Sequence, residues 1–158
     1  MRVLKLNTTS YVLNITEHKE FKEYMLGYIS KQPCTPLVEC NDDITNTDWQ
    51  NSQDHNREYV KKFKNILNPY LTKITKALYA ETFYVNNMWY QQYANNSKHQ
   101  WHRHTECNWS AVYYLELPSN DVATQLFDIP NNKIVHEKNI KEGDLFLLHQ
   151  LIEQSLFL

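Results

Sequence analysis

Two hydrophobic periods follow one another at the start of the chain. In residues 1–6 and 11–15 apolar and polar side chains alternate, which predicts two short strands joined by a polar turn. Thr16 is suited to cap the start of a helix, and apolar side chains then recur every three or four residues until Pro33: Phe21, Tyr24, Met25, Tyr28 and Ile29. This spacing predicts an amphipathic helix whose aromatic stripe packs in the core.

A polar segment and a second helical region come next. Residues 34–54 contain proline and a cluster of Asn, Asp and Thr, so we expect a loop there. Two apolar stripes at helical spacing lie on either side of Asn68-Pro69: Tyr59, Phe63, Ile66 and Leu67, then Tyr70, Leu71, Ile74 and Leu78. Because asparagine caps helices and proline favours their first turn, the stripes predict two helices that cover one side of a sheet.

From Thr82 onward the pattern is typical of β structure. Aromatic and β-branched residues at 83–93 predict a long strand, and residues 94–97 predict a turn. Further strands are predicted at 109–117, 123–127, 133–137 and 145–148, the last of them after a turn at 142–144. Helices followed by short antiparallel strands indicate an α+β fold with a barrel or a double-sheet jelly roll.

Length and composition limit the alternatives. The chain has 158 residues, 42% of them hydrophobic, so we expect one domain over 1–158 with helical support at about 16–80 and a strand core at about 82–150. A net charge of −2 without a basic run does not indicate nucleic acid. No segment approaches the ~18 apolar residues of a membrane span. A cytoplasmic location without disulfides is expected, because the cysteines are odd in number: Cys34, Cys40 and Cys107.

Candidate chemistry is concentrated in residues 99–104, which contain three of the seven histidines. In an extended chain His102 and His104 project to the same side with Cα atoms about 6.6 Å apart. Two neutral imidazoles at this spacing can share one metal ion, and iron, zinc, copper and nickel all accept imidazole. The alternative is a polar strand edge that is rich in histidine. His18, His55 and His136 are interpreted as surface or loop residues.

Four motifs carry a resemblance to a known family, and they lie in order along the chain. They are Trp89-Tyr90-Gln91-Gln92-Tyr93, His99-x-Trp101-His102-x-His104, Val112-Tyr113-Tyr114-Leu115-Glu116-Leu117-Pro118 and Glu142-Gly143-Asp144. The chain resembles the 2-oxoglutarate/Fe(II)-dependent oxygenases of the prolyl-hydroxylase-like class, notably those encoded by tailed phages. The resemblance implies a double-stranded β-helix (jelly roll, cupin-like), Fe(II), 2-oxoglutarate as co-substrate, and hydroxylation of an unidentified small molecule or protein side chain. A phage origin would place the protein in the host cytoplasm.

The resemblance also implies roles for individual residues. His102 matches the first metal histidine of the family, and His104 then stands where most members carry Asp or Glu. A second register makes His104 the first ligand and Glu106 the carboxylate. Tyr93 and Tyr114 match positions at which related enzymes place aromatic hydroxyls near the co-substrate, although both also fit a role as core tyrosines.

The C-terminal end departs from the family pattern. The family's distal metal histidine lies further along the chain than His149, and a basic residue that pairs with 2-oxoglutarate follows it. Residues 150–158 contain neither Arg nor Lys, so the tail resembles a truncated or frame-shifted end and the last strands are expected to be incomplete. His149 is the available third ligand. A catalytically degenerate β-helix protein that acts as a binding or virion accessory module is the alternative function, and a structural zinc site is less favoured because the cysteine spacing is wrong.

Overall fold

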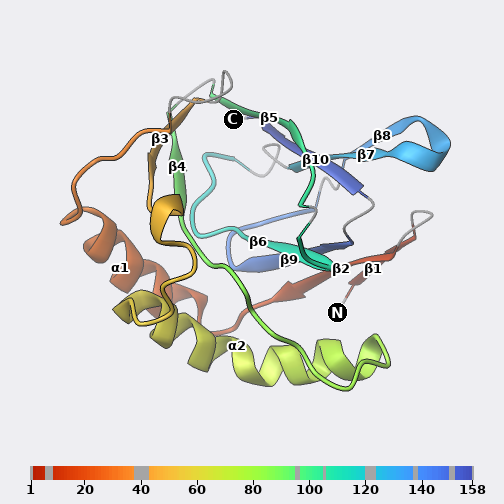
Figure 1. Cartoon of the computed structure of the whole chain (residues 1–158), viewed down its shortest axis with the longest axis horizontal. Coiled ribbons are helices and arrows are strands. Elements are labelled where there is room, and N and C mark those ends of the chain that lie inside the picture. The colour runs from red at the N-terminus through yellow and green to blue at the C-terminus, as the bar shows by residue number, and fades with distance from the viewer. Residues whose placement is uncertain are drawn as a thin grey trace.

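The chain forms two four-stranded antiparallel sheets, a two-stranded ribbon and two long helices (Figure 1). The computed structural model describes residues 2–5, 9–37, 43–94, 97–104, 106–119, 124–136, 139–149 and 152–157. The first sheet has the order β1 (Arg2–Lys5), β2 (Thr9–Asn14), β9 (Asp144–His149) and β6 (Trp109–Tyr113). The second has the order β5 (Lys98–His102), β10 (Ile152–Phe157), β7 (Thr124–Asp128) and β8 (Lys133–His136). The ribbon pairs β3 (Ile44–Thr47) with β4 (Gln91–Tyr93).

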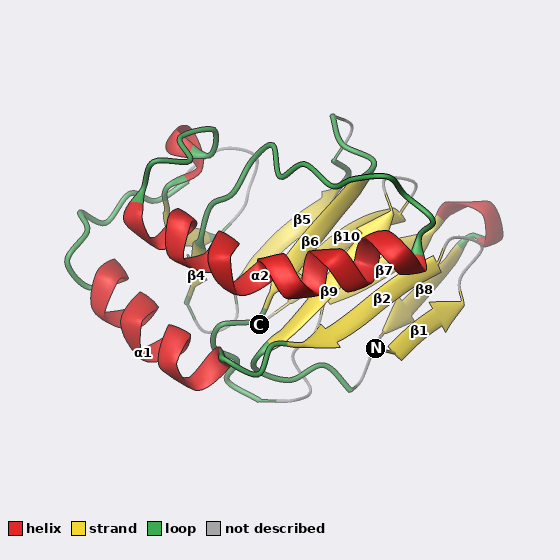
Figure 2. Cartoon of the chain, turned by 90° about the horizontal axis from the view of Figure 1, so that it is seen from below, coloured by secondary structure: helices red, strands yellow, loops and turns green. Residues whose placement is uncertain are grey.

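Both long helices cover one face of the first sheet. Figure 2 shows α2 (Glu58–Ala77) in front of its strands and α1 (His18–Ile29) beside α2. The contact is apolar and largely aromatic, with Phe21 of α1 stacked on Phe63 of α2 at a centroid distance of 4.7 Å. The sheet contributes side chains that alternate with others on its opposite face: Tyr11, Leu13, Leu145 and Leu147. This two-residue alternation is the reason why a strand buried on both sides reads as a continuous apolar run.

The opposite face of the first sheet packs toward the second sheet. Val12, Phe146 and Leu148 project to this side and share a smaller apolar cluster with Leu126 of β7 and Ile140. Phe146 and Leu126 are fully buried. The two sheets therefore face each other, with the smaller cluster between them.

The Glu142-Gly143-Asp144 turn joins these layers. The amide of Gly143 donates to the carbonyl oxygen of Tyr114 at 2.9 Å, and the amide of Tyr114 donates to the carbonyl oxygen of Asp144 at 3.0 Å. Gly143 has a φ of 82°, and a Cβ atom at this position would lie 2.8 Å from the ring of His18. Glycine meets both demands because it has no side chain. The turn thus fixes the backbone at Tyr114, which lines the cavity described below.

The prediction of two helices on either side of Asn68-Pro69 was wrong, because the structure has a single helix there. Helix α2 runs through Pro69 without a break. Its buried stripe is continuous across the proline: Tyr59, Val60, Phe63, Leu67, Tyr70 and Ile74. Asn68 and Pro69 are exposed, and so is Asn65, whose carbonyl loses its helical donor and can meet water instead. Packing of the stripe outweighs the local cost of the proline.

Three further local predictions need correction. The long strand predicted at 83–93 is paired only as β4, and residues 82–90 are extended without ladder partners. The loop predicted at 34–54 contains β3 and a 3-10 turn, η2 (Trp49–Asn51). Thr16 is not the N-cap of α1, because Glu17 holds that position and the Thr16 hydroxyl contacts Glu17 and Tyr70. Tertiary contacts from distant segments decide each of these cases.

The remaining strand predictions are confirmed by the described residues. The first two strands form the hairpin β1–β2, and β7, β8 and β9 occupy the predicted places. The strand predicted at 109–117 begins as expected but ends with β6 at Tyr113. The C-terminal tail contributes β10, which pairs with β5 on one side and β7 on the other. The tail therefore occupies an interior position of the second sheet. No described helix combines the length and the apolar character that a membrane span requires.

Candidate metal site and cavity

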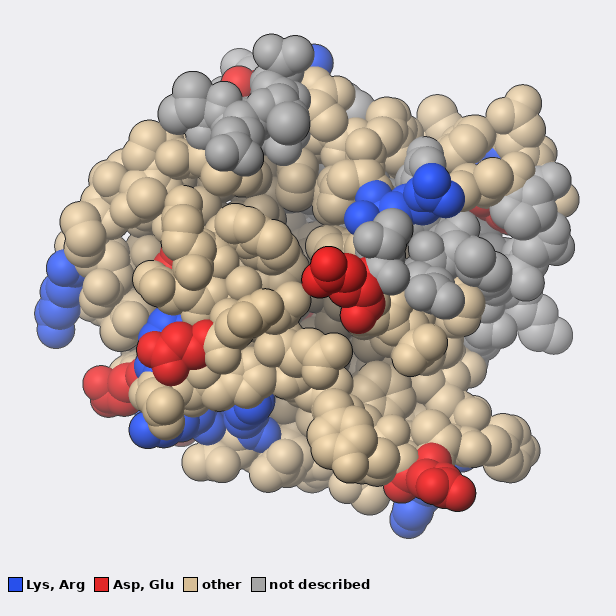
Figure 3. All heavy atoms as spheres, viewed as in Figure 1, with Lys and Arg blue, Asp and Glu red and all other residues tan. Residues whose placement is uncertain are grey.

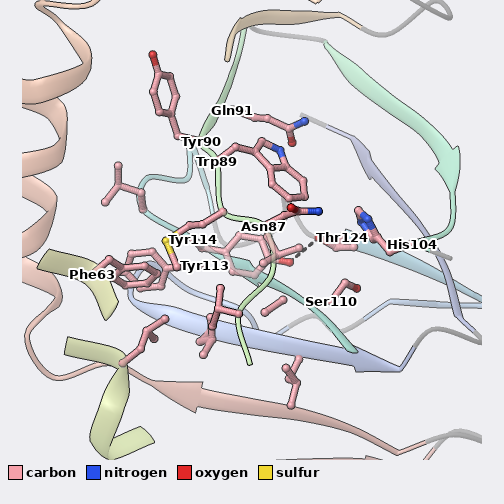
Figure 4. Close-up of a pocket in the computed structure, with 18 of the residues that line it drawn as sticks. Phe63, Asn87, Trp89, Tyr90, Gln91, His104, Ser110, Tyr113, Tyr114 and Thr124 are labelled. Carbon is pink, nitrogen blue, oxygen red and sulfur yellow. Dashed lines mark hydrogen bonds between the residues drawn. The ribbon is translucent and has the colours of Figure 1, made fainter. Parts of the chain in front are cut away.

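A cavity of about 960 Å³ lies beside the second sheet and reaches toward the helices. The extended segment 83–94 forms one wall, and β5, β6 and the start of β7 contribute others. Figure 4 shows His104, Ser110, Tyr114 and Thr124 around the same space as Trp89. Such a volume is in the range of pockets that hold small ligands.

His102 and His104 lie together at this cavity. Their ring centroids are 5.1 Å apart and the ring planes are nearly perpendicular, at 85°. With a metal–nitrogen distance of about 2.1 Å and ligand angles of about 90–110°, two imidazoles on one ion have centroids about 4.6–5.3 Å apart. The observed separation therefore fits two ligands of a shared ion.

A backbone hydrogen bond orients the His102 ring. Its Nδ1 lies 2.7 Å from the carbonyl oxygen of Gln100, an atom that can only accept. The proton is therefore on Nδ1, and Nε2 carries the lone pair that could bind a metal. Metal-binding histidines commonly hold their second nitrogen in this way, which sets both tautomer and orientation.

The strand β5 is irregular next to this pair. Between His99 and His102 the strand has one residue more than β10, so the register shifts there. A bulge of this kind re-aims side chains. As a result His99 stacks on His102 with centroids 3.9 Å apart, although alternation alone would place these rings on opposite faces. His99 is thus a neighbour of the pair that the spacing argument did not find.

Burial keeps the His104 imidazole neutral. Loss of solvent, and secondly the nearby His102, lower the pKa of His104 to about 4. Its ring also lies 6.1 Å from that of Trp89. A neutral imidazole is the form that binds metals, so His104 needs no deprotonation near pH 7.

His149 is not brought to this pair. It ends β9 on the same face as Leu145 and Leu147, and its ring packs edge-on against Trp109 at 5.0 Å. It is not among the residues that line the cavity, whereas exposed Glu106 is. Within the described part of the chain, no three His, Cys, Asp or Glu side chains converge as a metal site.

The two predicted tyrosines differ in their surroundings. Tyr114 is buried, and its hydroxyl lies 2.5 Å from Oγ1 of Thr124. Burial raises the pKa of Tyr114 to about 12, so it is a neutral hydrogen-bonding group. Tyr93 is half-buried, donates to Oε1 of Gln91 at 2.9 Å and lies 3.3 Å from Nδ1 of His99. Both line the cavity, on different walls.

Sequence reasoning missed two contributors to the cavity. Thr124 begins β7 and pairs with Tyr114, a contact that only tertiary structure creates. Arg103 is the one Lys or Arg among the described lining residues, and it is exposed. The signal for Arg103 was its position between two histidines. It was missed because the family pattern places the basic residue after the distal histidine.

Comparison with known proteins agrees with this geometry. The paired imidazoles and the helix-supported sheets define a candidate metal site in a mixed α and antiparallel β fold. Residues 87–150 match the model of a family described as "Putative 2OG-Fe(II) oxygenase". The predicted resemblance to the 2OG-Fe(II) oxygenase family is thereby confirmed over this part of the chain.

A solved structure shares the fold. A crystal structure of a prolyl-4-hydroxylase from Pseudomonas putida aligns with a TM-score of 0.65 and 12% sequence identity. The alignment covers 94% of this chain and 84% of that chain. At this identity the likeness establishes a shared fold, and says nothing of the substrate. No curated protein matches the chain.

Proposed function

We propose that the protein is an Fe(II)- and 2-oxoglutarate-dependent dioxygenase, a hydroxylase, in which His102 and His104 bind the iron. The observation that carries the proposal is the perpendicular pair of imidazoles at the cavity, 5.1 Å apart, with one tautomer set by a backbone carbonyl. The two facing sheets and the likeness to a prolyl-4-hydroxylase support a double-stranded β-helix. When bound, iron and 2-oxoglutarate would activate dioxygen as the oxidant, while the chain orients the reactants.

The donor set fits iron in part. The two imidazoles would supply two of the protein ligands that non-haem iron sites use, and a carboxylate or third histidine would complete the set. His149 stays our candidate for that position, and it would have to leave Trp109 to reach the pair. Glu106 is the alternative, because it lines the cavity two residues beyond His104.

The cavity offers hydroxyl groups that could bind 2-oxoglutarate, but Arg103, the cationic group among its described lining residues, is exposed to solvent. Tyr114 and Thr124 form a buried hydroxyl pair on the cavity wall that could donate to a carboxylate of 2-oxoglutarate. Tyr93 is a second candidate from the opposite wall. Arg103 could approach a carboxylate from the rim, where solvent would weaken the interaction.

Anaerobic spectroscopy tests the metal and co-substrate assignments together. Addition of Fe(II) and then 2-oxoglutarate to the full chain should produce a weak visible charge-transfer band. His102→Ala and His104→Ala should each abolish it, because one imidazole is then lost from the iron. His55→Ala is the matched control, since His55 is not among the cavity-lining residues. A band that is unchanged in His102→Ala would refute the ligand assignment.

The third ligand can be tested in the same experiment. His149→Ala and Glu106→Gln should be compared for the Fe(II) concentration that half-saturates the band. The variant that lacks the true third ligand should need about 10–100 times more iron. If neither variant shifts the titration, the two histidines are the whole protein contribution.

A catalytically degenerate binding protein is the second candidate function. It is favoured by the absence, among the described residues, of a third side chain that converges on the pair. It predicts no conversion of 2-oxoglutarate to succinate in the presence of iron, ascorbate and oxygen. Succinate above the level of the His102→Ala variant would exclude it, even without a known substrate.

A further inference from the structure

The wall of the cavity opposite His104 is a row of uncharged side chains. Residues 82–94 contain no Asp, Glu, Lys or Arg. In this extended segment Asn87, Trp89 and Gln91 point to one side and Tyr90 to the other, as Figure 4 shows, although all four contribute to the lining. Met88 and Tyr90 instead pack against the helix-covered core. Alternation along an extended backbone thus presents an amide, an indole and an amide in succession.

A buried ion pair holds this row in place. The Asp48 carboxylate accepts from the Tyr90 amide at 3.0 Å through Oδ1 and from Arg57 through Oδ2. Arg57 in turn donates to the carbonyl oxygen of Met88. The side chains of Arg57 and Asp48 are only 9% and 13% exposed. The pair therefore hydrogen-bonds to the backbone on both sides of Trp89.

These hydrogen bonds position Trp89 near His104. Its ring packs edge-on against Trp49 at 4.4 Å and lies 6.1 Å from the ring of His104. Two further contacts fix the same stretch, from the Thr47 hydroxyl to the carbonyl oxygen of Tyr90 and from the Met88 amide to that of Ser52. A segment without ladder partners is thereby fixed by hydrogen bonds to the backbone of Met88 and Tyr90.

The remaining charges of the cavity lie elsewhere. Glu116 and Glu142 both pair with Lys22 of α1, which offsets part of their charge. Arg103 and Glu106 are exposed. Acidic and basic side chains are also interspersed on the face shown in Figure 3, without an extended patch of one sign. A ligand that contacts the row therefore meets amides and an aromatic ring, and no compensating charge from the row itself.

We propose that Asn87, Trp89 and Gln91 form the substrate-recognition row of this site, that they select an uncharged, amide-bearing group with a flat ring, and that Asp48 and Arg57 position them. The substrate role rests on the proposed function. Side-chain amides both donate and accept, so they can pair with another amide, and the indole offers a face for stacking. A carboxylate in the same place would lose water without gaining a cation.

Ligand-observed NMR on the metal-free full chain tests the choice of ligand. The two probes are N-acetyl-tyrosinamide, which is neutral, and N-acetyl-tyrosine, which carries a carboxylate but is otherwise alike. Saturation transfer should show the amide binding about tenfold more tightly than the acid. Trp89→Ala should weaken binding of the amide about fivefold, and Asn87→Ala with Gln91→Ala should do so by a similar factor. Tyr79→Ala is the control, because Tyr79 is 98% exposed and is not among the lining residues.

The positioning pair is tested with two substitutions. Asp48→Asn and the milder Arg57→Lys should weaken binding of the amide probe as Trp89→Ala does, although Trp89 is still present. Circular dichroism checks that each variant is folded. If Asp48→Asn does not fold, Arg57→Lys alone tests the positioning role. Equal binding of amide and acid, or unchanged binding in Trp89→Ala, would overturn the recognition row. Wild-type binding of the amide probe in a folded Asp48→Asn or Arg57→Lys variant would overturn the positioning role.

Failure of the proposed function would look different. Co(II) binding by the His102–His104 pair can be followed by its visible spectrum, which does not involve the row. If the wild-type chain does not bind Co(II) but still binds the amide probe, the oxygenase proposal is wrong and the cavity is a site for neutral ligands. Intact Co(II) binding with no preference for the amide would count against the row alone.

Discussion

The two faces of the first sheet are built for different tasks. On the helix-covered face, Phe21 and Phe63 stack at 4.7 Å, and Tyr113 packs on Phe63 at the same centroid distance. On the other face the apolar cluster is smaller, and hydroxyl, amide and imidazole groups line most of a cavity of about 960 Å³, which reaches back to Phe63 and Tyr113 of the helix-covered core. Successive residues of one strand supply both: Tyr113 faces the helices, and Tyr114 lies in the smaller cluster.

This difference separates stability from chemistry. A close-packed aromatic core contributes the burial that holds the fold, because apolar area removed from water is the main stabilising term. A hollow lined with polar groups contributes little of that, and it leaves room for a ligand and its water-excluded reaction. Substitutions on the helix-covered face should therefore change stability, and those on the cavity face should change binding.

The largest expected effect is on the helix-covered face. Phe63→Ala removes a ring that is 8% exposed and in contact with two other aromatic rings, so it should lower the free energy of unfolding by about 3–5 kcal/mol. Urea denaturation followed by circular dichroism measures this. Tyr79→Ala, at a site that is 98% exposed, should change it by less than about 0.5 kcal/mol. A small effect of Phe63→Ala would mean that the stability lies elsewhere.

Protonation of His104 should lower the free energy of unfolding by an intermediate amount as the pH falls. Its pKa is about 4 in the folded chain and 6.5 ordinarily, so the unfolded chain takes up the proton first. The stabilising contribution is complete above about pH 6.5 and is lost between pH 6.5 and pH 4. It should amount to about 2 kcal/mol by pH 4.5, after allowance for partial exposure of the ring. Urea denaturation of wild type and His104→Gln at pH 7.5 and 4.5 should show a smaller pH dependence in the variant.

Much of the fold could be predicted because its local signals agree with its tertiary contacts. Two-residue alternation identified the β1–β2 hairpin, and Glu142-Gly143-Asp144 identified the turn before β9. Predictions were wrong where distant contacts decide. Pro69 reads as a helix break, yet the apolar stripe around it packs on the sheet as one helix. Residues 83–90 read as a strand, but their backbone is held by Asp48 and Arg57 instead of a ladder.

The candidate site divides in the same way. The pairing of His102 with His104 follows from their spacing, and the structure places the two rings together. The stacking of His99 depends on a bulge in β5, which spacing does not reveal. The pairing of Tyr114 with Thr124 joins β6 to β7 through tertiary structure. His149 was assigned from the family order, and its face on β9 depends on the register with β6.

The smallest expected change compares adjacent tyrosines on opposite faces. Tyr113→Phe loses a contact of 2.7 Å between its hydroxyl and Nδ1 of His18, and Tyr114→Phe loses the contact with Thr124. Each should cost about 1 kcal/mol of stability, since each leaves a partner without its hydrogen bond. Only Tyr114→Phe should weaken binding of 2-oxoglutarate in the anaerobic titration. Both tyrosines line the cavity, but the Tyr114 hydroxyl pairs with Thr124 on the cavity wall, whereas the Tyr113 hydroxyl contacts His18 of α1, which does not line it. Equal weakening by both variants would show that the cavity responds to the helix-covered core, and the separation of the two faces would then be wrong.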